Sequence, residues 1–420
     1  MYKINIKIVI AFLIMLAVAS MLLLVRKNIE PANPIKSKFW NMQSIDTVKY
    51  SRDMAGQFLN DRSFDTTIEE QVKAIAETGA THIALGTPYD EEFVPFLKRW
   101  VDISRKHGLK VWFRGNFSGW ENWFEYKDIS RDEHKVLLKN FIIDNGYLFE
   151  DGDVFSSCTE CENGGPGDPR HNGDTKGHRQ FLIDEYQIGK AAFRQIGKDV
   201  ATNYFPMNYD VAQLIMDKET TQALGGIVTI DHYVSSYEKM NTDINSLAKQ
   251  SGGKIIIGEF GAPIPDLHGD MTEKEQSDWI GSAFDLLAKN KNVTGVNYWT
   301  GFGGSTKLWK DDGSARTVVK TLTDFYTPKS LRGVVKNEAG IPIVNATLIG
   351  QEQSVNTDAN GQFSIPFLAS EIQVGVSADG YASSAITNIY GNKPITVYLK
   401  KQNEGLIYKL QKLLYQNLGI

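Results

Sequence analysis

The chain is poor in cysteine: only Cys158 and Cys161 occur among its 420 residues. So few cysteines exclude the disulfide framework that stabilises small secreted domains, and stability must come from ordinary core burial. The pair has Cys-x-x-Cys spacing, and His171 and His178 follow it. This spacing matches no standard zinc pattern, and redox pairs of this kind usually begin a helix in another fold. We expect packing or a local disulfide here, with no metal and no cofactor.

An excess of positive charge is also lacking. The formal net charge is -5, and the basic residues are scattered along the chain. This composition excludes a general nucleic-acid binder and gives no reason to expect a nucleic-acid partner. Aromatic residues are well represented, with eight Trp and seventeen Tyr. Such rings pack in cores and also stack on the faces of sugars.

Long hydrophobic runs are missing except at the N-terminus, where Ile8 to Val25 carry no charge and Arg26 and Lys27 follow. The run is close to the span of a bilayer and long for the apolar part of a signal peptide. We expect a transmembrane anchor over residues 1–27 and a linker over 28–44. A small-residue triplet, Ala17-Val18-Ala19, leaves a cleaved signal as the alternative. Either interpretation exports the body of the protein, to the outer side of the cell membrane or into the medium.

Strand-like and helix-like segments alternate through residues 45–328, as in βα units. The pattern predicts a (β/α)8 TIM barrel, with an open doubly wound sheet as the alternative; no Gly-rich phosphate turn supports the latter. The predicted strands are Thr47–Tyr50, Ile83–Gly86, Lys110–Phe113, Val154–Cys158, Tyr204–Met207, Ile227–Ile230, Ile255–Gly258 and Val293–Tyr298. The predicted helices include Thr67–Glu77, Phe93–Lys106, Arg179–Gly197 and Lys274–Lys289.

The character of the chain changes near residue 329. Short alternating segments separated by Gly- and Asp-containing turns predict a small β-sandwich over residues 329–402. Residues 403–420 carry leucines at helical spacing, which predicts an amphipathic C-terminal helix. We expect its apolar stripe to pack against the protein or a neighbour, with membrane contact as the alternative.

Polar and aromatic residues follow the predicted strands at their C-terminal ends, the face on which barrels gather their functional groups. We take the following as substrate-binding candidates: Arg52, Asp53, Arg114, Trp120, Asn208, His232, Tyr233 and Trp299.

Two carboxylates stand out among these strand ends. Glu259 ends a buried β-branched run, Ile255-Ile256-Ile257-Gly258, and Glu160 follows the fourth predicted strand. Hydrolysis of a glycosidic bond with retention requires two carboxyl groups about 5–5.5 Å apart, one as nucleophile and one as acid/base. We assign Glu259 as nucleophile and Glu160 as acid/base, with Glu162 as the alternative acid/base.

These motifs resemble the retaining glycoside hydrolases of clan A, the cellulase and mannanase-like barrels. The likeness covers roughly residues 45–326 and lies in Thr159-Glu160, Asp231-His232-Tyr233, Gly258-Glu259-Phe260-Gly261 and Tyr298-Trp299-Thr300. It implies that Tyr233 hydrogen bonds Glu259, that His232 contacts substrate, and that Trp299 forms the floor of the sugar subsite. It also implies that Arg114 stabilises the charge of the nucleophile.

One departure from this family concerns the residue before the acid/base. The family usually has Asn there, whereas this chain has Thr159. The leading hypothesis is a membrane-anchored retaining β-glycosidase that acts on a polysaccharide or glycoconjugate. Because of Thr159, an inactive carbohydrate-binding surface protein is the alternative hypothesis. A metal-dependent barrel hydrolase is a third hypothesis, but the sequence lacks the His clusters that such an enzyme would need.

The C-terminal segment resembles the carboxypeptidase regulatory-like domains, which have a transthyretin-like fold. The likeness lies in Gly333-Val334-Val335, the Gly340–Thr347 segment, Thr357-Asp358-Ala359-Asn360-Gly361 and Ala378-Asp379-Gly380-Tyr381. Gly and Asp occupy turns here for backbone reasons and imply no catalysis. The resemblance implies an accessory spacer, stabiliser or binding module.

Overall fold

A computed structural model describes residues 38–165, 167–350, 353–368, 372–387 and 394–402. The N-terminal apolar segment and the expected C-terminal amphipathic helix both lie outside these residues. Within the described ranges, no helix combines the length and apolar character needed to cross a membrane.

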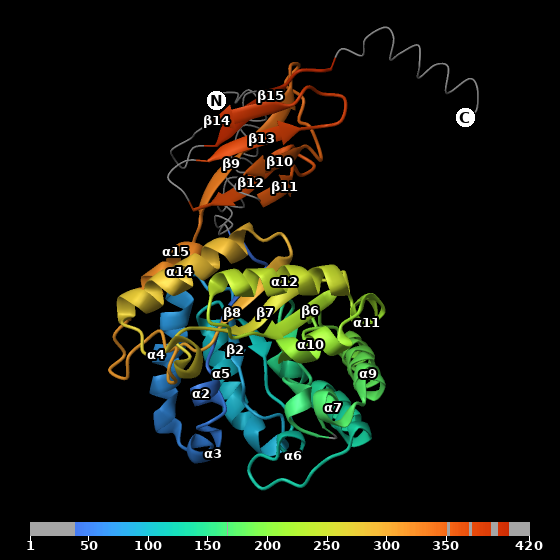
Figure 1. Ribbon diagram of the computed structural model, residues 1–420, viewed down its shortest axis with the longest axis vertical. Coiled ribbons are helices and arrows are strands. Elements are labelled where there is room, and N and C mark those ends of the chain that lie inside the picture. The colour runs from blue at the N-terminus through green and yellow to red at the C-terminus, as the bar shows by residue number, and fades with distance from the viewer. Residues whose placement is uncertain (1–37, 166, 351–352, 369–371, 388–393, 403–420) are drawn as a thin grey trace, which may run out of the picture. The chain divides into compact units, whose positions relative to one another are not determined.

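The larger part of the described chain is an α/β structure around eight parallel strands (Figure 1). Their order in the sheet is β4-β3-β2-β1-β8-β7-β6-β5. Between the two end strands, Phe155 N–H donates to Ala201 O at 2.8 Å and Ala201 N–H donates to Asp153 O at 3.0 Å, which links β4 to the segment before β5 and closes the barrel. The strands are β1 (Met42–Asp46), β2 (His82–Leu85), β3 (Lys110–Phe113), β4 (Val154–Phe155), β5 (Pro206–Asn208), β6 (Ile227–Asp231), β7 (Lys254–Phe260) and β8 (Val293–Tyr298).

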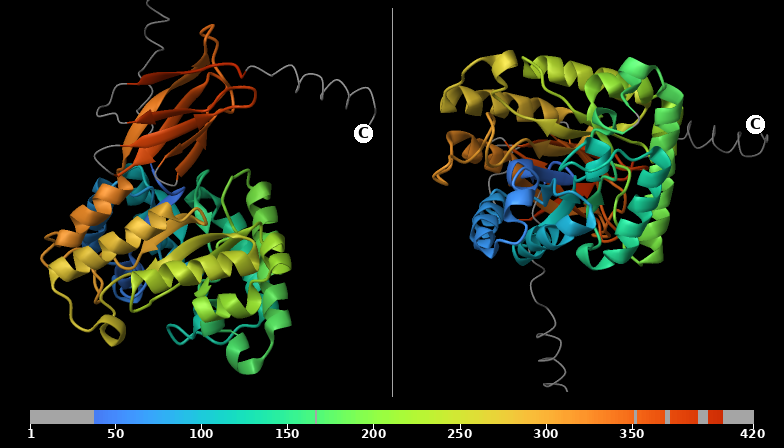
Figure 2. Two further views of the ribbon diagram at one scale, coloured as in Figure 1. Left: turned by 45° about the horizontal axis from the view of Figure 1, so that its top comes forward. Right: turned by 90° about the horizontal axis from the view of Figure 1, so that it is seen from below.

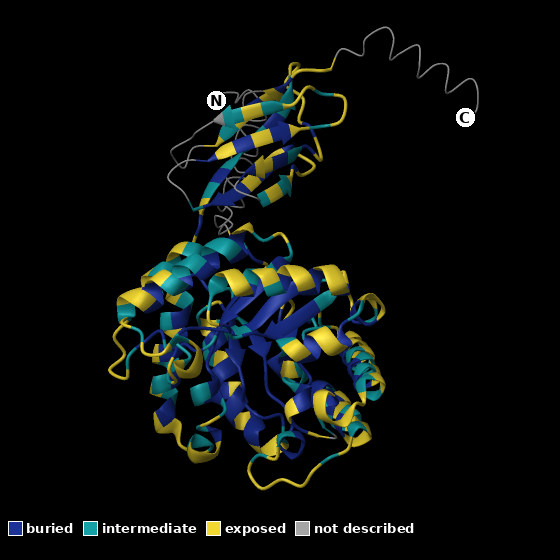
Figure 3. Ribbon diagram, viewed as in Figure 1, coloured by how far each residue is buried: buried dark blue, intermediate teal, exposed yellow. Residues whose placement is uncertain are grey.

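Amphipathic helices surround the strands (Figure 2), with their apolar faces inward and their polar faces in solvent (Figure 3). The long ones are α4 (Asp65–Glu77), α5 (Val94–Lys106), α7 (Arg131–Asp144), α9 (Thr175–Gln195), α12 (Tyr237–Ser251), α14 (Glu273–Lys289) and α15 (Thr317–Tyr326). Shorter ones are α2 (Val48–Ser51), α3 (Ala55–Phe58), α6 (Ser118–Glu121), α8 (Pro169–Asn172), α10 (Tyr209–Ile215), α11 (Lys218–Ala223) and α13 (Pro265–His268). Single 3-10 turns cover Arg62–Phe64, Glu91–Phe93, Gly146–Leu148 and Cys161–Asn163.

The first strand corrects the sequence prediction. We expected Thr47–Tyr50, whereas β1 is Met42–Asp46 and α2 begins at Val48. The strand carries two polar residues, Gln43 and Ser44, yet both are buried. The amide of Gln43 donates to Tyr326 O at 2.9 Å, and this buried hydrogen bond offsets the cost of removing the amide from water. Because Gln43 is polar, the sequence pattern did not indicate a buried strand at this position.

Five further strands differ from their predicted ranges. β2 begins and ends one residue earlier than predicted, at His82 and Leu85, and β6 runs one residue further, to Asp231. β7 runs from Lys254 to Phe260, so it includes Glu259 instead of ending before it. β4 ends at Phe155 instead of Cys158, because the chain turns into a loop that contains Glu160 in the left-handed region, with φ 48°. β5 begins two residues later than predicted, at Pro206. β3 and β8 have the predicted bounds.

The C-terminal part forms two β-sheets over one apolar core. One sheet has the order β11-β10-β13-β14 and the other β12-β9-β15. Their inward side chains include Val335, Leu348, Ile365 and Val374, all fully buried. The strands are β9 (Lys329–Asn337), β10 (Thr347–Gly350), β11 (Gln353–Asn356), β12 (Gln362–Phe367), β13 (Gln373–Ser377), β14 (Ser384–Thr387) and β15 (Ile395–Leu399).

Candidate active site

A bulge in β7 presents Glu259 at the mouth of the barrel. Ile230 pairs with Ile257, but the next residue of β6, Asp231, pairs with Glu259, so Gly258 is the extra residue. A Cβ at Gly258 would lie 2.3 Å from Asp231 Oδ1, closer than real contacts allow. A bulge bends its strand and re-aims the next side chain. The glycine before Glu259 is therefore required for packing, and it sets the direction of the carboxylate.

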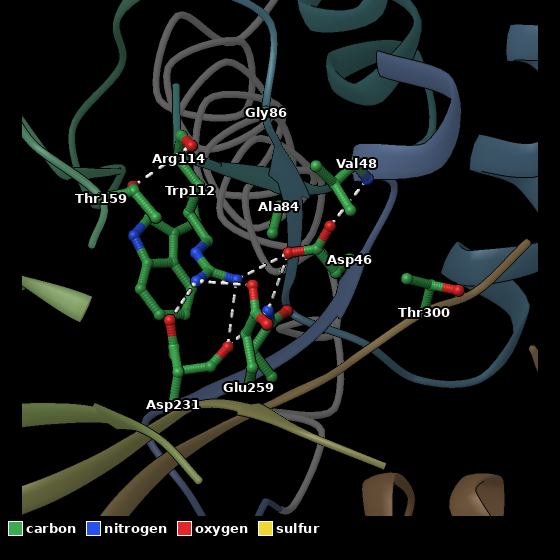
Figure 4. Close-up of polar contacts among 12 residues, drawn as sticks. Asp46, Val48, Ala84, Gly86, Trp112, Arg114, Thr159, Asp231, Glu259 and Thr300 are labelled. Carbon is green, nitrogen blue, oxygen red and sulfur yellow. Dashed lines mark hydrogen bonds and ion pairs between the residues drawn. The ribbon is translucent and has the colours of Figure 1, made fainter. Parts of the chain in front are cut away.

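Arg114 connects three carboxylates at the end of the barrel (Figure 4). Its guanidinium lies 2.7 Å from Asp46 Oδ2, 3.1 Å from Asp231 Oδ2 and 3.0 Å from Glu259 Oε1. It also donates to Gly258 O at 3.1 Å. The Arg114 side chain is almost completely buried, and burial of a cation is tolerated only when it is well paired. The predicted contact between Arg114 and Glu259 is present in this arrangement.

Glu259 has a second donor in Tyr233, whose hydroxyl lies 2.8 Å from Oε2. The two carboxylate oxygens are thus held separately, one by a cation and one by a phenol. Burial raises the pKa of Glu259 to about 7, while Arg114 and Tyr233 oppose that rise by stabilising the ionised form. The carboxylate keeps a fraction of its surface in solvent, 16% of the side chain.

Glu160, the predicted acid/base, lies close enough to Glu259 for their charges to interact. It lies on the loop after β4, and its backbone N–H donates to Pro206 O at 2.8 Å. Burial and the neighbouring Glu162 raise the pKa of its carboxyl, and the charges of Glu160 and Glu259 interact. A carboxyl that retains its proton is what an acid catalyst needs.

Glu162, the alternative acid/base, has a different environment. Its Oε1 accepts hydrogen bonds from the backbone N–H and side-chain amide of Asn208, at 2.7 and 2.9 Å. Glu162 is 3% exposed, whereas Glu160 is only partly buried. These contacts favour Glu160 over Glu162 as the group that reaches substrate. They also occupy Asn208, which we had expected to bind substrate.

Three of the other candidates, Trp299, Arg52 and Asp53, are partly or largely exposed. The ring of Trp299 is half-buried and lies edge-on to Tyr233, with 5.8 Å between centroids. Arg52 forms an ion pair with Asp53 at 2.8 Å and lies 5.0 Å from the ring of Trp123. A partly exposed indole next to the tyrosine that binds Glu259 offers a flat apolar face of the kind that sugars stack on.

His232 and Trp120 do not take the positions expected for substrate contacts. His232 is buried, its Nε2 lies 2.9 Å from Asp243 Oδ2, and its ring stacks on Tyr209. Trp120 is 1% exposed and stacks on Phe181, with 4.9 Å between centroids. The residues around Trp120 in the sequence gave no sign of this burial, because the stacking partner is distant in the chain.

Sequence reasoning missed a polar chain that reaches the site from the barrel wall. Asn116 Nδ2 donates to Glu121 Oε1 at 2.7 Å, and Asn116 Oδ1 lies 2.9 Å from His134 Nε2. On the far side of the ring, His134 Nδ1 lies 3.2 Å from Glu185 Oε1. Burial raises the pKa of Glu121 to about 8, and its charge interacts with that of Glu160. No motif marks these four residues, since they come from three helices and the loop after β3.

Cys158 and Cys161 form a disulfide around Thr159 and Glu160, one of the two outcomes expected from their spacing. Among the described residues, no three His, Cys, Asp or Glu side chains are grouped so as to hold a metal ion.

Comparison with known proteins identifies one part of the chain. Residues 330–400 match the carboxypeptidase regulatory-like domain family, which confirms that resemblance. No curated protein matches the chain.

Solved structures similar to the chain include β-glucuronidase 3 of Bacteroides uniformis, with 12% identity, a TM-score of 0.43, and coverage of 80% of this chain and 47% of that one. The β-D-glucuronidase of Dictyoglomus thermophilum has 13% identity and a TM-score of 0.46, with 69% and 51% covered. A β-glucuronidase of Ruminococcus gnavus in complex with D-glucuronic acid has 11% identity and a TM-score of 0.44, with 62% and 45% covered. The chain thus spans about half the length of each of these proteins.

Proposed function

We propose that this protein is a retaining β-glycosidase that hydrolyses a polysaccharide or glycoconjugate. The observation that carries the proposal is the environment of Glu259, held at the barrel mouth by Arg114 at 3.0 Å and Tyr233 at 2.8 Å, with the Glu160 carboxyl close enough to interact with its charge. Hydrolysis of a glycosidic bond with retention uses two carboxyl groups whose environments favour opposite protonation states. In this proposal the N-terminal segment anchors the enzyme, and the barrel lies outside the cell membrane.

The two carboxyl groups have opposite tasks in the first step. Glu259 attacks the anomeric carbon and forms a glycosyl ester, while the bond from that carbon to the leaving oxygen breaks and Glu160 donates its proton to this oxygen. In the second step Glu160 takes a proton from water, and the water oxygen displaces Glu259. Arg114 and Tyr233 stabilise the carboxylate form of Glu259, which is the attacking and the departing species.

Replacement of Glu259 by Gln tests the nucleophile. The amide keeps the shape of the side chain but does not form the glycosyl ester, so we expect kcat to fall by about 10³-fold or more. Circular dichroism and the melting temperature should show a folded variant. A fully active Glu259→Gln enzyme contradicts the assignment.

Azide rescue tests which glutamate is the acid/base. With Glu160→Ala, azide should enter the open space and yield a β-glycosyl azide from an activated aryl glycoside. The matched variant is Glu162→Ala, which opens the same space at the other glutamate, and Glu162→Gln, which retains an acceptor for Asn208, shows whether loss of that contact matters. If azide products form only with a variant of Glu162, the acid/base is Glu162.

An inactive carbohydrate-binding protein is the second candidate, and one contact favours it. The Thr159 hydroxyl donates to Arg114 O at 3.2 Å, so the residue before Glu160 bonds to the backbone instead of offering an amide to a sugar hydroxyl. Calorimetric sugar binding with no hydrolysis across a broad panel of glycans supports this candidate and excludes the enzyme.

A further inference from the structure

The loop that carries Glu160 is closed on itself by a covalent bond. Cys158 and Cys161 are joined across Thr159 and Glu160, with 5.2 Å between their Cα atoms. Both cysteines are buried, whereas Thr159 and Glu160 between them are partly exposed. The disulfide therefore forms the inner side of the loop, and the carboxyl is on its outer side.

Each end of the disulfide is attached to the barrel wall. Asn116 Nδ2 lies 3.6 Å from Cys158 Sγ, and Trp120 Nε1 donates to Cys161 O at 3.3 Å. Trp120 and Asn116 are themselves fixed, by the stacking of the indole on Phe181 and by the contact of the amide oxygen with His134. Displacement of either sulfur would disturb buried groups.

The backbone conformation of Glu160 suggests what the disulfide-closed loop does. Its φ of 48° and ψ of 54° lie in the left-handed region, which is unfavourable for a residue with a Cβ. The restraints that hold it there include the disulfide between the two cysteines and the hydrogen bonds of Glu160 N–H to Pro206 O and of Asn163 N–H to Glu160 O, each at 2.8 Å. Without the disulfide, the backbone is free to relax, and the direction of the Glu160 side chain would change.

A global stabilising role is the competing explanation, and the size of the loop opposes it. A disulfide stabilises a fold chiefly by restricting the unfolded chain, and the effect grows with the number of residues enclosed. Here the cysteines are only three positions apart. The stabilising effect on the whole fold is accordingly near the small end of the range for disulfides.

We propose that the Cys158–Cys161 disulfide is a positioning brace that holds Glu160 in the geometry needed to protonate the leaving group. The inference rests on the proposed glycosidase function. The brace acts through Glu160 and touches neither the sugar nor the nucleophile, so its loss should weaken acid catalysis and leave attack by Glu259 intact.

The dependence of the rate on the leaving group provides the test. The double variant Cys158→Ala/Cys161→Ala and the wild type reduced to two thiols are compared on two glycosides of one sugar. An alkyl glycoside needs protonation of its leaving oxygen, whereas a dinitrophenyl glycoside departs without it. We expect kcat/KM to fall about tenfold or more on the alkyl glycoside, a part of the 10²–10⁴-fold that acid catalysis contributes. The loss on the dinitrophenyl glycoside should stay below about threefold.

The chain supplies its own control for the reductant. Because it has only two cysteines, a reductant that acts through this bond should not change the double variant. Equal losses on both glycosides, or no loss on either, overturn the proposal. Alkylation of two thiols in the untreated, denatured protein also overturns it.

Hydrogen exchange separates failure of the brace from failure of the proposed function. On reduction, peptides that cover residues 158–163 should exchange faster while those of β7 and β8 keep their protection. If the wild type hydrolyses no glycoside, the glycosidase proposal fails and this measurement still tests the brace. Unchanged exchange over residues 158–163 contradicts the brace whatever the activity.

Discussion

The barrel and the C-terminal β-sheets differ in what they bury. In the described residues of β9 to β15 and their turns, the buried side chains are apolar except for Thr357. The barrel buries Asp46, Arg114, Asp231 and Glu185 as well as a large apolar core. Removal of charges from water costs several kcal/mol for each ion before pairing compensates it. The C-terminal part avoids that cost, whereas the barrel bears it at its strand ends.

This contrast separates stability from chemistry. An apolar core explains a fold completely, and nothing in the C-terminal sheets requires more than packing and turns. Buried charges grouped at one end of a barrel need a second explanation, because apolar residues of similar size would often be as stable or more so. In the barrel, pairing by Arg114 and the opposing positions of Glu259 and Glu160 supply that explanation.

The largest expected effect on stability is that of Arg114→Met in the barrel. It leaves Asp46, Asp231 and Glu259 without their shared cation, so we expect the free energy of unfolding at pH 7 to fall by about 3–5 kcal/mol. The loss should shrink toward pH 4, where protonation neutralises Glu259 and Asp231, whose pKa values are raised by burial. Urea denaturation at both pH values measures it. A variant as stable as the wild type at pH 7 would show that the arginine is not needed to hold these charges.

The matched change in the C-terminal sheets is Leu348→Ala. Leu348 is fully buried among apolar side chains, and the cavity should cost about 2–5 kcal/mol of stability in that part of the chain. The loss should be the same at pH 4 and pH 7, since no ionisable group is involved. Thermal denaturation at the two pH values tests this. We expect kcat of the folded protein to be unchanged, and a large fall in kcat would contradict the separation of the two regions.

Removal of the Tyr233 hydroxyl tests how strongly this donor stabilises the Glu259 carboxylate. A hydrogen bond to a charged group contributes about 1.5–3 kcal/mol, so Tyr233→Phe should lower kcat/KM by roughly ten- to a hundredfold. With Glu259 titrating at about 7 in the wild type, the acidic limb of the pH profile should lie near that value. Loss of the donor raises the pKa of Glu259, so the limb should move to higher pH. A limb that moves to lower pH contradicts the role of Tyr233.

The smallest expected effect concerns Glu121. Its pKa in the folded protein is about 8, above its ordinary value of 4.5. The folded state therefore favours the protonated carboxyl, and the wild type loses stability as the pH rises from about 4.5 to about 8. Glu121→Gln has no proton to lose, so it should be roughly 1–2 kcal/mol more stable than the wild type at pH 8.5. At pH 4 the two proteins should have equal stability by urea denaturation.

Much of the barrel could be predicted because its strands are buried on both faces. Runs such as Ile255-Ile256-Ile257 have one interpretation, and the residue that follows them lies at the barrel mouth by topology. The approach of Arg114 and Tyr233 to Glu259 was an implication of the family resemblance. β1 escaped prediction because Gln43 and Ser44 are polar residues of the kind usually found at the surface, and the buried hydrogen bond of the Gln43 amide to Tyr326 O joins residues far apart in the chain.

The sequence by itself determined the alternation of strands and helices, the β-rich C-terminal segment and the position of Glu259 near the end of a buried strand, because each depends on local periodicity. Tertiary structure alone decided the rest of the site. The burial of Trp120 against Phe181, the contact of Glu162 with Asn208 and the polar chain from Glu121 to Glu185 all join residues far apart in the chain. Hydrogen bonding, burial and charge interaction depend on distance in space, and only the folded chain fixes those distances.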